Sequence, residues 1–208
     1  MAANNVKINY INGEKASEDI FKSTIDKMSP DILHFATHGF FFPDPYRKGE
    51  KQKDTGSEDR STMIGVRTFV RNDNPLFRSG LVLAGANDVW SQEMKGEKED
   101  GVLTAYEVSN LNMQNTKLVA MSACETGLGD IRGSEGVYGL QRAFKMAGVD
   151  FLIMSLWQIP DRETVEFMTI FYEQFFKQKD IRKAFITAQS QMREKYDPYY
   201  WAAFVLVE

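Results

Sequence analysis

Apolar residues follow two patterns along this chain, one typical of strands and one typical of helices. Short continuous apolar runs, the pattern of buried strands, occupy residues 31–37, 79–86, 116–123 and 150–157. The segment VKINYI at residues 6–11 alternates apolar and polar side chains, and the run YYWAAFVLV closes the chain, so each predicts a further strand. The pattern therefore predicts about six strands.

Segments with apolar side chains three and four residues apart separate most of these strands and predict helices. The first runs from Ser17, its predicted N-cap, to Met28, and Pro30 ends it. Further helices are predicted over 104–111 and 134–147, and after the N-cap residues Asp161 and Asp180. Strands that are apolar on both faces and alternate with helices are typical of a mostly parallel sheet. We therefore predict one α/β domain over 1–208, a three-layer sandwich with a central, mostly parallel sheet flanked by helices.

Residues 43–78 break this alternation, because they are rich in proline, glycine and charge. They predict a long surface loop, with a short hairpin near Ile64–Val70. Loops of this length in compact domains are usually functional or disordered. Because the segment carries several arginines, we expect it to regulate activity, either through cleavage or by ordering on a partner.

Composition and charge narrow the functional classes. The net charge is −4 and no strongly basic segment stands out, so we expect no direct nucleic-acid binding. The first ten residues lack the apolar core of a signal peptide, and no apolar run approaches the roughly 18 residues of a membrane-spanning helix. We therefore expect a cytoplasmic protein with no membrane association.

The chain has one Cys, which excludes an intramolecular disulfide and a Cys-rich zinc site, and leaves either a buried thiol or a reactive one.

Two residues that suit acyl-transfer chemistry follow two of the predicted strands. His38 follows the run 31–37, and Cys124 follows the run 116–123. If these strands are neighbours in a parallel sheet, both residues lie at its carboxyl edge, where α/β proteins bind ligands. An imidazole assists a thiol to become a thiolate and then protonates the leaving amine. Gly39 has no Cβ and so allows its N–H to approach an oxyanion closely.

Three segments resemble the CHAT family, relatives of caspases and separase. They are HFATHGFF, LVAMSACETGLGDIRGSEG and FLIMSLWQIPD, and NPLFRSGLVLAGA is similar to an intervening strand of that family. The resemblance spans about residues 30–208. It implies a caspase-like fold and a cysteine endopeptidase that needs no metal and no organic cofactor.

The resemblance also implies roles for individual residues. His38 matches the catalytic base and Cys124 the nucleophile, and the backbone N–H groups of Gly39 and Cys124 match the oxyanion site. Asp161 resembles an acidic residue that lines the P1 pocket of the separase-like relatives. A buried carboxylate favours a charged partner, so Asp161 in this place predicts cleavage after Arg or Lys. Cleavage after small or apolar residues stays open, since members of the family need not share one P1 preference.

Other interpretations of these residues stay open. Cys124 also suits a buried structural thiol, and Asp161 suits a simple helix cap. His34 and His38 form His-x-x-x-His, but the Glu of zinc peptidases is absent and the segment is predicted as strand, so we interpret His34 as a core or supporting residue. The spacing of the glycines after Cys124 departs from a dinucleotide-binding loop, so we expect no nucleotide.

At the level of the whole protein, the main alternative is a catalytically silent CHAT-fold interaction module. A cysteine hydrolase or transferase that acts on a small amide is a third possibility. By resemblance, the substrate is a protein or peptide and the setting is bacterial signalling, defence or regulated cell death. We also expect that the chain belongs to a longer protein or works with a helical-repeat sensor or activator.

Overall fold

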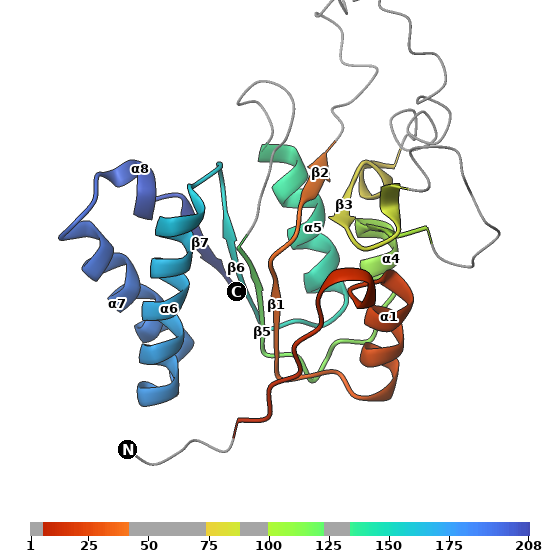
Figure 1. Cartoon of the computed structure of the whole chain (residues 1–208), viewed down its shortest axis with the longest axis horizontal. Coiled ribbons are helices and arrows are strands. Elements are labelled where there is room, and N and C mark those ends of the chain that lie inside the picture. The colour runs from red at the N-terminus through yellow and green to blue at the C-terminus, as the bar shows by residue number, and fades with distance from the viewer. Residues whose placement is uncertain (1–5, 42–73, 88–99, 123–133) are drawn as a thin grey trace, which may run out of the picture.

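The computed structural model describes residues 6–41, 74–87, 100–122 and 134–208. Its elements form three layers, with helices on both faces of a central sheet (Figure 1). One face is covered by α1 (Glu18–Lys27), α4 (Ala105–Ser109) and α5 (Ser134–Met146). The other is covered by α6 (Asp161–Gln178) and α7 (Ile181–Arg193), beside the short α8 (Pro198–Trp201). The predicted α/β sandwich is confirmed at this level.

The main sheet has four strands in the order β1-β5-β6-β7. They are β1 (Ile32–Phe35), β5 (Leu118–Met121), β6 (Phe151–Ser155) and β7 (Phe204–Val207). The first three are parallel, and β7 runs antiparallel to β6. All four residues of β5 are buried, because Val119 and Met121 face α1, α4 and α5 whereas Leu118 and Ala120 face α6 and α7.

The prediction of about six strands in this sheet is therefore wrong, and two segments account for the difference. The run 79–86 gives β3 (Ser79–Val82), which belongs to a second, antiparallel sheet with β2 (Gly39–Phe41) and β4 (Val102–Thr104). Residues 6–11 form no strand. Ile8 and Tyr10 are 81% and 80% exposed, so the alternation of that segment finds no apolar surface in the described part of the chain.

The small sheet is tightly packed at its middle strand. A Cβ added at Gly80 would lie 2.4 Å from the Leu103 carbonyl oxygen and 2.7 Å from the Phe40 ring, so only glycine fits between β2 and β4. Ser79, Gly80 and Leu81 are all buried. This burial explains why the sequence of an antiparallel strand has the apolar pattern of a parallel one.

Two of the predicted helix caps are present and one is not. The Ser17 hydroxyl accepts a hydrogen bond from the Ile20 N–H at 3.4 Å, and Asp180 accepts one from the Lys183 N–H at 3.0 Å. Asp161 is instead the first residue of α6, and Pro160 occupies the N-cap position without a side-chain hydrogen bond.

Of the predicted loop 43–78, residues 43–73 lie outside the described residues, and Pro75–Phe77 form a 3-10 helix. Among the helices described, none is long and apolar enough to cross a membrane.

Candidate active site

The strands that precede His38 and Cys124 are neighbours. β1 and β5 pair in parallel, with Phe35 opposite Met121 at their carboxyl ends. One residue beyond, the Ser122 N–H donates a hydrogen bond to the Phe35 carbonyl at 3.0 Å. The two segments that follow β1 and β5 therefore leave the main sheet side by side, at the edge below β2 in Figure 1.

His38 lies between the two sheets. It follows β1 by three residues, its side chain is exposed, and its carbonyl accepts a hydrogen bond from the Val82 N–H at 2.8 Å. The Thr37 hydroxyl donates to the Val82 carbonyl. Because two consecutive residues hold the same residue of β3, the backbone around His38 is fixed where the chain crosses from β1 to β2.

Gly39 begins β2 and lies opposite Leu81 in the small sheet. A Cβ added there would come no closer than 3.4 Å to the Gly80 carbonyl oxygen, which is ordinary van der Waals contact. Packing within the described residues therefore does not require glycine at this position, in contrast to Gly80.

The other two predicted site residues are Cys124 and Asp161, and the structure describes only the second. Cys124 lies outside the described residues; β5 ends at Met121, and Ser122 stands two positions before Cys124. Asp161 is exposed at the start of α6, after the connection that leaves the carboxyl end of β6. Because β6 is parallel to β5, Asp161 follows the same edge of the main sheet from which the chain leads to Cys124.

His34 bridges a helix and the end of β5. Its Nε2 lies 2.9 Å from Ser122 Oγ, and its Nδ1 lies 3.1 Å from the Tyr172 hydroxyl of α6. Ser122 Oγ also lies 3.3 Å from the Phe35 carbonyl, to which it donates. His34, which the sequence predicts as a core or supporting residue, thus makes a polar contact at the end of the strand that leads to Cys124. In the parts of the chain that the structure describes, no three His, Cys, Asp or Glu side chains gather in a way that would hold a metal ion.

The local environment keeps the side chains of His34 and Tyr172 uncharged. Burial lowers the pKa of His34 from its usual 6.5, although part of its surface stays open to solvent. Burial also raises the pKa of Tyr172. At neutral pH the imidazole and the phenol are therefore both neutral, and the contacts between them are hydrogen bonds.

Sequence reasoning missed Ser122 and Tyr172 as members of this site. Ser122 carried one signal, because it stands two residues before the only Cys. Tyr172 carried a weaker one, since it lies on the apolar face of α6 but its hydroxyl needs a polar partner once it is buried. Neither signal names His34 as the partner.

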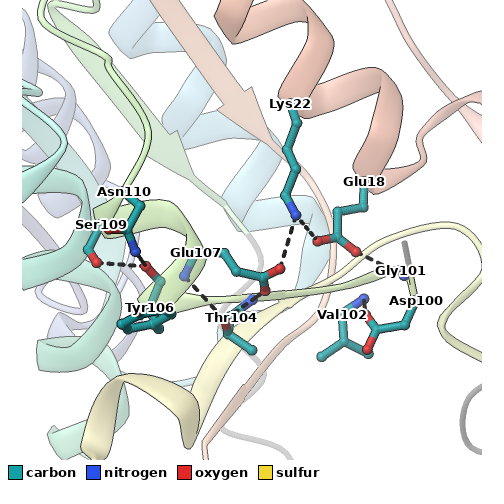
Figure 2. A network of polar contacts seen from close by, with 10 residues as sticks. All are labelled: Glu18, Lys22, Asp100, Gly101, Val102, Thr104, Tyr106, Glu107, Ser109 and Asn110. Atoms are coloured by element: carbon teal, nitrogen blue, oxygen red, sulfur yellow. Dashed lines mark hydrogen bonds and ion pairs between the residues drawn. The ribbon is translucent and has the colours of Figure 1, made fainter. Parts of the chain in front are cut away.

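A second cluster of titratable groups lies on the opposite face of the main sheet (Figure 2). Lys22 Nζ forms ion pairs with Glu18 at 2.7 Å and Glu107 at 3.0 Å. The Gly101 N–H donates to Glu18 at 3.0 Å, and Glu107 and Thr104 form a capping box at the start of α4. One cation thus serves two carboxylates and connects α1 to β4 and α4. This cluster joins elements of the fold and contains no nucleophile.

A family model for the CHAT domain matches the chain over residues 2–208. No curated protein is significantly similar to the chain.

Proposed function

The chain belongs to the CHAT domain family, and from this premise we propose that it is a cysteine endopeptidase with Cys124 as nucleophile and His38 as general base. The observation that carries the proposal is the parallel pairing of β1 with β5. It brings the chain segments that lead to the two residues to one edge of the sheet. The exposed side chain of His38 at that edge is accessible to a substrate.

In this mechanism His38 accepts the thiol proton of Cys124, and the thiolate attacks the carbonyl carbon of the scissile peptide bond. The backbone N–H groups of Gly39 and Cys124 donate to the oxyanion of the tetrahedral intermediate. The C–N bond then breaks, and the imidazolium of His38 returns its proton to the leaving amine. A water molecule, deprotonated by His38, attacks the resulting thioester and releases the acid and the free thiol.

Asp161 is the proposed determinant of P1 preference. It follows β6 at the same edge of the sheet, and its carboxylate is not used to cap α6. It is therefore available to pair with an Arg or Lys side chain of the substrate. Asp161→Asn should lower the preference for basic P1 residues without loss of stability, and Glu163→Gln in the same turn is the matched control. A strong preference for P1 Leu in the unsubstituted protein would contradict this role.

The single Cys makes a direct test possible. The protein is incubated with peptidyl electrophiles that differ only at P1 (Arg, Lys, Asp, Leu or Ala), and covalent labelling is followed by intact mass. Fast, P1-selective labelling that Cys124→Ala abolishes and His38→Ala slows by about a hundredfold or more would support the peptidase. Labelling no faster than by a simple alkylating agent, and equal in His38→Ala, would favour the catalytically silent interaction module.

The natural substrate and activator are proposed on the same basis. By membership in the CHAT domain family, we propose a protein substrate in bacterial signalling, defence or regulated cell death. A helical-repeat sensor or activator, in the same polypeptide or in another, would control the site. Labelling that rises when such a partner is added would support this part of the proposal.

A further inference from the structure

A chain of hydrogen bonds links α6 to the end of β5 through the imidazole of His34. It runs from the Tyr172 hydroxyl to Nδ1 at 3.1 Å, from Nε2 to Ser122 Oγ at 2.9 Å, and from Ser122 Oγ to the Phe35 carbonyl at 3.3 Å. The rings of His34 and Tyr172 also contact each other, with centroids 5.6 Å apart. Ser122 is therefore held by a side chain from the neighbouring strand as well as by the backbone bond to Phe35.

The directions of these bonds follow from the end that can only accept. The Phe35 carbonyl has no hydrogen, so the Ser122 hydroxyl donates to it. The Ser122 oxygen is then free to accept from the Nε2–H of His34, and Nδ1 accepts from the Tyr172 hydroxyl. In this arrangement every polar hydrogen of the three side chains is used, and the imidazole is neutral with its proton on Nε2.

We propose that His34 is a positioning residue for the nucleophile, which it holds in place through Ser122. The inference rests on the proposed function of Cys124. Cys124 follows Ser122 by two residues, and two residues of extended chain span at most about 7 Å. A fixed Ser122 therefore limits the distance from it at which Cys124 can lie. His38 leaves the same hydrogen-bonded pair of strand ends, three residues after Phe35. The hydrogen-bond chain thus holds together the two strand ends from which the proposed catalytic residues follow.

The same three side chains also have the outline of a nucleophile, a base and an orienting group, with Ser122 as the nucleophile. Two observations favour positioning instead. The 3.3 Å contact between Ser122 Oγ and the Phe35 carbonyl uses the hydroxyl hydrogen, because a carbonyl oxygen can only accept. The group behind His34 is a neutral phenol, which cannot stabilise an imidazolium as a carboxylate does. Ser122 therefore acts as a link in the chain of hydrogen bonds.

The test compares His34→Ala, Ser122→Ala and Tyr172→Phe with the unsubstituted protein. A misplacement of about 1 Å lowers catalytic rates by about a hundredfold, so each variant should lower the labelling rate of Cys124 by peptidyl electrophiles by about tenfold to a hundredfold, with their apparent affinity little changed. The pH midpoint of alkylation by iodoacetamide should move up toward that of a free thiol, about 8.5. His34→Gln retains an amide donor near the Nε2 position and should restore part of the rate.

A matched control comes from a second tyrosine bonded to α6. The Tyr196 hydroxyl donates to Glu166 of α6 at 2.7 Å rather than to His34. Tyr196→Phe removes the same group, a tyrosine hydroxyl, from a residue that follows α7, and should leave both the labelling rate and the pH midpoint unchanged. Thermal unfolding of each variant separates a positioning effect from loss of the fold.

Iodoacetamide needs no substrate recognition, so this measurement distinguishes failure of the inference from failure of the proposed function. A shift of the alkylation midpoint in the three variants supports the positioning role even if no peptidyl electrophile reacts. If all three variants match Tyr196→Phe in midpoint and rate, the inference is wrong, even where His38→Ala shows that the peptidase is active. Labelling of Ser122 itself by a fluorophosphonate would also overturn it.

Discussion

Replacement of Glu18 by Gln should remove a pH-dependent loss of stability that the buried cluster of Figure 2 imposes. Glu18 is 1% exposed, and burial raises its pKa from 4.5 to about 7, against the favourable contact with Lys22. The folded protein therefore binds a proton at Glu18 more readily than the unfolded chain does. Between pH 4.5 and about 7, the free energy of unfolding falls as the pH rises, and above that window this group adds no further change.

The size of the effect follows from the displacement of the pKa. A change from 4.5 to about 7 corresponds to roughly 3 kcal/mol across the window. Glu107 does not offset it there. Burial opposes its charge, but hydrogen bonds from Thr104 and Lys22 outweigh burial and lower its pKa, so its contribution is lost only at more acidic pH.

The assay is urea unfolding at several pH values between about 5 and 8. The unsubstituted protein should lose stability relative to Glu18→Gln as the pH rises, by up to about 3 kcal/mol. Asp19→Asn changes an exposed carboxylate in the same turn of α1 and serves as the control for the loss of one negative charge from that turn. A constant difference between the unsubstituted protein and Glu18→Gln at every pH would refute the reasoning, because it would mean that Glu18 has the same pKa in the folded and unfolded chains.

Three further substitutions test the packing, the caps and the site. Gly80→Ala should destabilise the protein by about 1–3 kcal/mol or more in thermal unfolding, because the new methyl meets the backbone of β4 and the ring of Phe40; unchanged stability would contradict the close packing of the small sheet. Gly39→Ala should leave the unfolding temperature nearly unchanged yet slow the labelling of Cys124 by peptidyl electrophiles, and a normal labelling rate would argue against an oxyanion role. Asp180→Ala should cost about 1 kcal/mol through loss of the cap of α7, measured by urea unfolding against Ser190→Ala on the exposed face of that helix.

Local signals in the sequence predicted most of the elements. Ser17 and Asp180 cap helices because the interaction lies within one turn, and the runs 31–37 and 116–123 contain the strands β1 and β5. The prediction that failed, that the run 79–86 joins the main sheet, depends on contacts between residues distant in sequence. The run 79–86 is buried under α5 in a second sheet, and an apolar run does not say which sheet a strand joins.

The site divides in the same way. In the sequence, suitable residues follow two buried strands, and the parallel pairing of β1 with β5 meets the condition that brings the ends of these strands to one edge. The contact of His34 with Ser122 and Tyr172 could not, because it joins residues from β1, the end of β5 and α6. A lone polar residue in an apolar strand or helix indicates that a partner exists, but only the fold identifies it.

The small sheet also bears on how such a protein can change in length. Phe41 pairs with Ser79, and Val82 pairs with Val102, so each connection between its strands returns to the residue opposite the one it left. For a closed loop of this kind, doubling the length adds only about 0.6 kcal/mol of chain entropy. Insertions at these two connections therefore leave the four-stranded sheet, and the edge where β1 and β5 end, almost unaffected. A lineage can acquire new recognition segments there while β1 and β5 stay constant.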